Sequence, residues 1–253
     1  MKIIRALTSL GTAVAFIALP IAAQQPSSLQ EDRQVVIPAR PSWERVPTPE
    51  TVNVPLTGQQ KQLRQNRSDS FNHRLGLAAK LEDTAQAGGG VGATTDHGFI
   101  PPLPVNSPAI IVGKVISAQS HLSSDHTTIY TELKVQIEKI LQDTSANLVS
   151  HGSLDILETG GAVTLNGKIL HYPVSNSSGL VDVGKRYVLF LHTKPPGLDA
   201  FGITKAWLLD QGHPQPTRAY RPSDQENVGR YMAMTEPEFI SHVEQAIADH
   251  NIR

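Results

Sequence analysis

Apolar and polar residues alternate along several short segments in the second half of the chain. The longest is TTIYTELKVQIEKILQD, in which one set of alternate positions holds Ile129, Thr131, Leu133, Val135 and Ile137. Successive side chains of a strand point to opposite faces, so this pattern predicts a half-buried strand over residues 127–143. Leu133, Ile137, Ile140 and Leu141 also fit helical spacing, and the C-terminal half of the segment therefore stays open between strand and helix.

Other segments of the same half also predict strands. AVTLNGKILHYP carries Asn166-Gly167 between two apolar runs, which predicts a hairpin because a type I′ turn needs positive φ at both central residues. AIIVGKVISAQ is rich in β-branched residues, and its Gly113 is expected at a bulge or a close approach. The predicted strands lie within residues 109–119, 151–161, 162–173, 183–193 and 201–212, and the proline-containing segment 213–229 is expected to be a loop.

The last segment, TEPEFISHVEQAIADHN, predicts a helix over residues 235–250. Thr235 can cap it and Glu238, three residues on, completes a capping box. Its apolar face consists of Phe239, Ile240, Val243 and Ile247. Five to seven short strands followed by one helix predict a mainly β fold for residues 107–253, a small antiparallel barrel or sandwich capped by the helix.

Residues 24–106 have a different composition from the predicted domain. They hold nine of the 18 prolines, many Gln and Asn residues, and the stretch AGGGVGATTDHGFIPPLPVNSP. Proline removes a donor and fixes φ, so we expect this extension to be largely extended or disordered. Leu63, Arg67 and Phe71 nevertheless follow helical spacing, which allows a short helix within residues 59–81.

The N-terminus has the layout of a secretory signal peptide over residues 1–23. Lys2 and Arg5 form a positive region, an apolar run follows from Ala6 to Ile21, and Ala23 is a small residue before the cleavage site. The alternative is an uncleaved anchor, but the run is shorter than the about 20 apolar residues that a spanning helix needs. We therefore expect export to the periplasm or the extracellular space, with no stable membrane anchor after cleavage.

Composition and charge exclude several classes of function. The chain of 253 residues has no cysteine, which excludes disulfides, thiolate nucleophiles and cysteine-ligated metal sites. Its net charge is −1, and neither the extension nor the predicted domain has an excess of basic residues. Nucleic acid is therefore not an expected partner.

The stretch SHLSSDHTTIYTE, residues 120–132, has the residue types of a metal site. His121, Asp125, His126 and Glu132 offer nitrogen and oxygen ligands for a divalent metal such as zinc. The alternative is the polar tip of a hairpin, where Ser, Asp and His are ordinary loop residues. A serine triad is disfavoured because its members converge from separate segments of a chain. We assign no catalytic residue and no cofactor.

The segments IIVGKVIS, IYTELKVQIEKIL, GSLDILETGG, LNGKILHY and VGKRYVLFL resemble a class of uncharacterised secreted bacterial proteins. Their arrangement over residues 109–210 is also similar to the OB-fold-like barrels of the netrin and tissue-inhibitor-of-metalloproteinase type. The resemblance implies an OB-like barrel with a binding role. The chain lacks the disulfides of those modules and the N-terminal cysteine with which the inhibitors chelate a protease's zinc.

We therefore expect an exported, non-catalytic domain that binds another protein or a component of the cell envelope. One alternative is a metal-binding protein or metal-dependent enzyme centred on residues 121–132. A third interpretation is a structural envelope protein whose extension reaches toward a partner.

Overall fold

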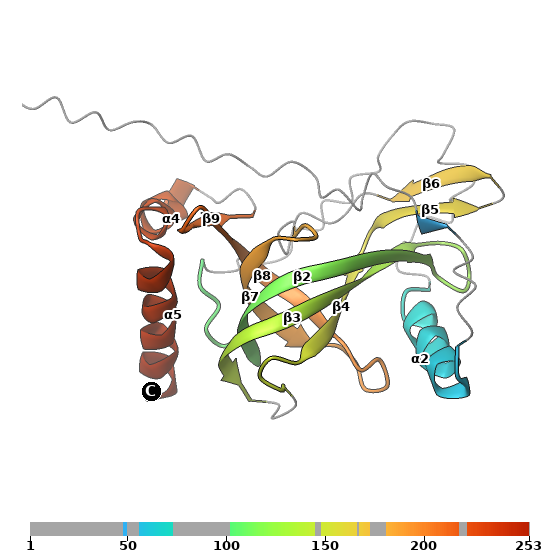
Figure 1. Ribbon diagram of the computed structural model, residues 1–253, viewed down its shortest axis with the longest axis horizontal. Coiled ribbons are helices and arrows are strands. Elements are labelled where there is room, and N and C mark those ends of the chain that lie inside the picture. The colour runs from blue at the N-terminus through green and yellow to red at the C-terminus, as the bar shows by residue number, and fades with distance from the viewer. Residues whose placement is uncertain are drawn as a thin grey trace, which may run out of the picture. The chain divides into compact units, whose positions relative to one another are not determined.

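Six strands form the main sheet, in the spatial order β4-β3-β2-β7-β8-β9 (Figure 1). The computed structural model describes residues 48–49, 56–72, 102–144, 148–165, 167–172, 181–217 and 222–252. The strands of the main sheet are β2 (Ala109–Leu122), β3 (Ile129–Asp143), β4 (Ser153–Thr159), β7 (Arg186–Thr193), β8 (Phe201–Asp210) and β9 (His213–Pro216). All neighbouring pairs in this order are antiparallel. The predicted mainly β, antiparallel class is confirmed.

The main sheet curls until strands far apart in the order meet. Ile156 of β4 pairs in parallel with Phe201 of β8, which brings five strands round into a ring. The closure consists of this one residue pair, and β9 continues beyond it, so the barrel is only partly closed.

A second, smaller sheet has the order β1-β5-β6. Its strands are β1 (Thr48–Pro49), β5 (Gly161–Leu165) and β6 (Lys168–Tyr172), and β1 runs parallel to β5. The predicted hairpin is confirmed, because β5 and β6 are antiparallel and Gly167 between them has φ +74°. Asn166 lies outside the described residues.

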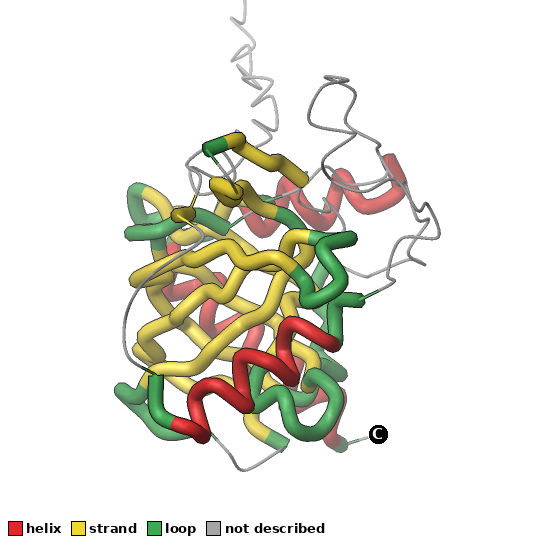
Figure 2. Tube along the Cα trace, turned by 90° about the vertical axis from the view of Figure 1, so that its right-hand side faces the viewer, coloured by secondary structure: helices red, strands yellow, loops and turns green. Residues whose placement is uncertain are grey.

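Helices lie outside the strands of the main sheet (Figure 2). They are α2 (Gly58–Asp69), the 3₁₀ turn η1 (Pro222–Asp224), α4 (Gln225–Met232) and α5 (Glu236–Asn251). The predicted C-terminal helix is confirmed: the Glu238 carboxylate accepts hydrogen bonds from the Thr235 N–H and hydroxyl, both 2.8 Å. Among the described residues, no helix combines the length and the apolar character needed to cross a bilayer.

The two faces of the main sheet carry two separate cores. The inner face packs its apolar side chains together inside the curled sheet, with Leu133, Val135 and Leu189 at its centre. The other face packs Val188, Phe190 and Trp207 against α4 and α5. Strand β7 therefore buries both faces over residues 187–191, as its continuous apolar sequence indicates.

Gly113 lies where β2 and β3 come closest. A Cβ at this position would lie 2.8 Å from Val135 Cγ1 and 2.9 Å from the Gln136 carbonyl oxygen. The register between β2 and β3 shifts between Val112 and Gly113. Both expectations for this glycine, a bulge and a close approach, are confirmed.

One region differs from its sequence-based expectation, and a helix overlaps residues 59–81, where helical spacing allowed one. Residues 213–229 are not all loop, because 213–216 form β9 and 225–232 form α4. The prolines of β9 are tolerated because it is an edge strand, where a missing N–H breaks no ladder on the outer side. Within the predicted extension 24–106, residues 58–69 form α2, whereas the signal segment 1–23 lies outside the described residues.

Candidate functional site

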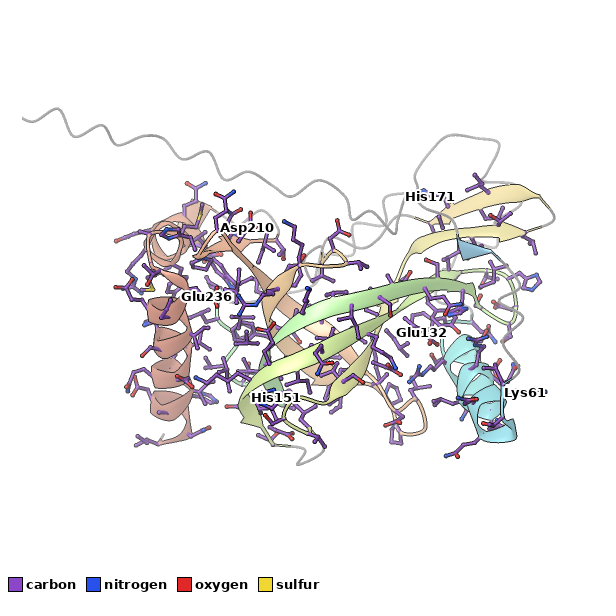
Figure 3. All side chains as sticks on the ribbon, in the orientation of Figure 1. Lys61, Glu132, His151, His171, Asp210 and Glu236 are labelled. Carbon is purple, nitrogen blue, oxygen red and sulfur yellow. The ribbon has the colours of Figure 1, made fainter. Side chains whose placement is uncertain are left out.

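Helix α2 lies against the outer face of β2, β3 and β4 and forms the candidate site with them. Strand alternation and register place three side chains of β2 and β3 on this face, since His121 pairs with Tyr130 and Glu132 lies two residues further along β3. Figure 3 shows Glu132 on the side of the sheet toward α2, which carries Lys61. All of the contacts described below belong to this interface.

The sequence of α2 forms a helix through polar contacts. Thr57 caps it in a capping box with Gln60, and Gln62 and Gln65 donate side-chain hydrogen bonds to Asn66 and Asp69, both 2.9 Å. The helix has 12 residues, a length at which isolated helices are marginal in water. Its docking on the sheet therefore contributes to its stability.

Arg67 is the main anchor of α2 and is 3% exposed. Its guanidinium forms ion pairs with Glu132 at 3.2 Å and Asp155 at 2.9 Å. It also donates to the carbonyl oxygens of Leu198 and Asp199 in the β7–β8 loop, both at 2.9 Å. These partners satisfy the buried charge, so Arg67 fixes the C-terminal half of α2.

Phe71 is the second anchor, immediately after α2. Its ring is 1% exposed and stacks on Tyr130, with 4.6 Å between ring centroids and 6° between planes. Asn72 continues the contact, because its side chain hydrogen-bonds to the Ser124 hydroxyl and accepts from the Asp125 N–H. The segment thus touches both the β2–β3 loop and the β7–β8 loop.

Two cavities lie between α2 and the sheet. The larger, about 520 Å³, lies toward the β2–β3 loop, and the smaller, about 350 Å³, lies toward β4. Leu56 and Arg64 line both cavities. The larger is also lined by Lys61, Gln65, Ser68, Ser120, His121, Leu122, Ser123, Ser124, His126, Tyr130 and Val163. Space therefore remains on both sides of α2, between the helix and the strands on which it packs.

Two polar atoms at this interface are buried and have no hydrogen-bond partner among the described residues. They are His121 Nε2 and Glu132 Oε1. Buried polar atoms without a partner are rare in folded proteins and mark positions that bind water, an ion or a ligand. His121 and Tyr130 line the larger cavity, and Glu132 lines the smaller one.

Burial shifts the pKa values of three groups of the site in the direction that favours their uncharged forms. Burial, with the nearby charges of Arg64 and Arg67, lowers the pKa of His121 to about 4. Burial raises the pKa of the Tyr130 phenol and, against the opposing charge of Arg67, that of Glu132. At neutral pH, His121 is thus an uncharged imidazole and Tyr130 an uncharged hydroxyl.

The four predicted metal ligands do not form one site. His121 lies in β2 and Glu132 in β3, where Glu132 binds Arg67. Asp125 lies in the loop, and its Oδ1 accepts from the Ser123 hydroxyl and from the N–H and hydroxyl of Thr127. His126 follows in the loop with φ +57°. Over the described ranges, no three His, Asp or Glu side chains are grouped as metal ligands.

Most residues of this site were not singled out as site residues by the sequence. Arg67, Phe71, Tyr130 and Asp155 make the docking contacts, and Lys61 and Arg64 line the larger cavity. The available signal was the helical spacing of Leu63, Arg67 and Phe71, together with the alternation that puts Tyr130 and Glu132 on the outer face. Neither pattern shows that the two segments meet.

The site has groups that can bind a partner, but among the described residues its buried serine hydroxyls near His121 hydrogen-bond to groups other than a histidine. Ser120, next to His121 in sequence, contacts the Thr131 hydroxyl, and Ser123 donates to Asp125 and accepts from the Thr127 and Thr128 N–H groups. Ser123 serves to close the loop rather than to contact a histidine.

Comparisons with known proteins assign no family. No protein-family model matches the chain, and no curated protein is similar to it in sequence.

Proposed function

We propose that this chain is an exported, non-catalytic binding domain whose partner is another protein. The observation that carries the proposal is the docking of α2 through Arg67, which inserts between Glu132 and Asp155. The site recognises a short helical segment by one basic and one aromatic side chain four residues apart, Arg67 and Phe71. A partner segment with the same two features would compete with α2 for it.

The receiving groups all belong to the β domain. Glu132 and Tyr130 are on β3, Asp155 is on β4, and the accepting carbonyl groups are in the β7–β8 loop. A helix that docks on a groove through a few anchor side chains is a common mode of peptide recognition, and here one anchor lies on α2 and the other just after its end. The cavities beside α2 leave room for a larger segment to occupy the same surface.

We also propose that the domain is an OB-like barrel. Support comes from the ring of five strands, which is partly open and joined by the single parallel pair between β4 and β8. OB-folds bind ligands on the face of their second and third strands and with the loops after the first and fourth strands. The corresponding elements here are β3, β4 and the loops 123–128 and 194–200, which α2 contacts.

Export is the third part of the proposal. It rests on the sequence of residues 1–23, with Lys2 and Arg5 before the apolar run and Ala23 before the cleavage site. The partner would accordingly be a protein of the periplasm or of the extracellular space.

A peptide-exchange experiment tests the binding role. A labelled peptide of residues 56–72 is titrated into the wild-type chain and into the Arg67→Ala chain, and fluorescence anisotropy is recorded. The peptide should bind the Arg67→Ala chain about tenfold more tightly, because the weakened α2 no longer competes for the site. Peptides from a library that bind the same site should carry a basic and an aromatic residue four positions apart.

Two controls define the outcome. A peptide with Arg67→Ala should not bind either chain, because it lacks the group that pairs with Glu132 and Asp155. The Lys61→Gln chain should bind the wild-type peptide as the wild-type chain does, because no described contact docks α2 through Lys61. Failure of the wild-type peptide to bind the Arg67→Ala chain would rule out recognition in trans.

A further inference from the structure

We propose that the larger cavity beside α2 binds an oxyanion, a phosphate or carboxylate group of a small molecule, between Arg64 and Lys61 of α2 and Tyr130 and His121 of the sheet. This inference goes beyond the proposed protein partner, because Lys61, Arg64 and His121 take no part in the Arg67 and Phe71 contacts that anchor the segment. It assigns a ligand class to a cavity of about 520 Å³.

The charge of the cavity wall is positive. Lys61 and Arg64 line it, and none of the described lining residues is acidic. The nearest carboxylates have other contacts: Asp69 with the Ser124 hydroxyl, Asp125 with Ser123 and Thr127, and Glu132 with Arg67. The smaller cavity differs, because Glu132 and Asp155 line it and offset its basic residues. The larger cavity is thus the one suited to an anion.

The donors that remain for a ligand are few and specific. The serine hydroxyls of the wall are used within the protein: Ser68 donates to the Leu122 carbonyl, Ser120 contacts the Thr131 hydroxyl, and Ser123 donates to Asp125. His121 Nε2 is buried and has no partner among the described residues, and the Tyr130 hydroxyl, which lies beside Ser68, also lines the cavity. Together with the cations of α2, they are the groups that an incoming oxyanion would satisfy.

His121 would act as a neutral donor in this site. Burial and the charges of Arg64 and Arg67 lower its pKa to about 4, so the ring is neutral at pH 7. In the tautomer that carries its proton on Nε2, the neutral ring donates a hydrogen bond from that atom. A bound anion would favour the charged imidazolium and raise the pKa of His121. The ring therefore reports on occupancy of this cavity and not of the rest of the surface.

The size of the cavity points to an anionic group on a larger molecule. Pockets for small ligands typically enclose about 300–1,000 Å³, and this cavity lies in that range. The exposed residues Lys61, Ser124 and His126 belong to its lining, so the remainder of the ligand can extend toward solvent.

Calorimetric titration of the whole chain with glycerol 3-phosphate, acetate and glycerol tests the proposal. Glycerol 3-phosphate or acetate should bind and glycerol should not. Arg64→Gln should weaken binding about tenfold or more, the cost of one hydrogen bond to a charged group. Lys114→Gln is the matched control, because it removes an exposed cation from β2 outside the cavity and should leave the affinity unchanged. No heat from either anion up to about 10 mM, or equal loss in both variants, would overturn the proposal.

Two further measurements locate the ion and its source. In NMR titrations, saturating glycerol 3-phosphate should raise the pKa of His121 in the wild-type chain, with a smaller rise in Arg64→Gln; binding without this rise would place the ion elsewhere and overturn the proposal. Sedimentation with phosphatidylglycerol vesicles distinguishes a lipid headgroup from a free small molecule. Exchange of the residue 56–72 peptide tests the protein partner separately, so either proposal can fail alone.

Discussion

At the scale of single residues, the site contrasts the satisfied charge of Arg67 with the neutral ring of His121. Arg67 is buried, and each of its nitrogens has a partner, whereas His121 Nε2 has none among the described residues. The two residues respond differently to burial because Arg67 gains two carboxylates and His121 gains none. Burial thus costs His121 its charge but not Arg67.

The neutral state of His121 predicts a loss of stability in acid. Its pKa is about 4 in the folded chain and about 6.5 when unfolded, so the unfolded state binds a proton in this window that the folded state does not. The free energy of unfolding should therefore fall by about 1–3 kcal/mol as pH drops from 6.5 to 4. Urea denaturation at pH 7, 5.5 and 4 measures this fall.

His121→Gln is the comparison for this prediction. Glutamine keeps a polar side chain at the cavity but does not titrate, so the variant should lose less stability than the wild type over the same pH range. Identical pH dependence in the two chains would mean that the pKa of His121 is not depressed.

At the scale of elements, α5 is attached to the sheet by an apolar face and two ion-pair contacts. Phe239, Val243 and Ile247 are buried against the outer core. At its N-terminal end, Arg186 of β7 binds both Glu138 and Glu236, the latter through two hydrogen bonds of 3.0 and 3.1 Å. Further along, Lys139 pairs with Glu244 at 2.7 Å, and both side chains are about half exposed.

These two contacts should differ in their contribution to stability. Arg186→Gln should lower the free energy of unfolding by about 1–2 kcal/mol, because it breaks a bidentate network that links two strands and a helix. Lys139→Gln should change it by less than about 0.5 kcal/mol, because an exposed pair is screened by solvent. Thermal unfolding at low and high salt provides the comparison, and equal effects of the two substitutions would contradict this ranking.

The elements that sequence patterns predicted are those with local signals. The alternation in residues 127–143, the Asn166-Gly167 turn and the Thr235–Glu238 capping box are each encoded within a few residues. The C-terminal half of β3 fitted both strand and helix patterns. It forms a strand because alternate residues, Val135 and Ile137, pack into the core inside the curled sheet. Strand β9 was missed because its prolines are typical of a loop until a neighbouring strand is known.

The candidate site could not be assembled from the sequence for a physical reason. Arg67 contacts Glu132, Asp155 and Asp199, which are 65, 88 and 132 residues away along the chain. Arg67 lies in a glutamine-rich segment, and nothing in that segment indicates that its side chain is buried. The carboxylates that make its burial possible are distant in sequence. The sequence singled out His121 and Glu132 as candidate ligands of one ion, whereas in the structure they line two different cavities.

At the scale of the whole molecule, a cysteine-free β domain and its N-terminal region act together. The domain has apolar clusters on both faces of its main sheet and contains no cysteine, while residues 56–72 contribute Arg67 and Phe71, which dock on its outer face. The N-terminal region thus combines a proposed export signal with a helix that occupies the proposed binding surface. Cleavage after Ala23 would remove the proposed export signal, and substitution of Arg67 would weaken the docking of α2, so the two roles can be tested separately.

The proposed signal peptide predicts a mature chain that begins at Gln24. Expressed in a bacterium, the full chain should be recovered outside the cytoplasm, and mass spectrometry should show the loss of residues 1–23. Val14→Glu puts a charge into the apolar run and should leave the chain uncleaved in the cells, whereas Gln25→Glu, just beyond the cleavage site, should not affect export. An uncleaved chain in the membrane fraction would instead identify residues 6–21 as an anchor.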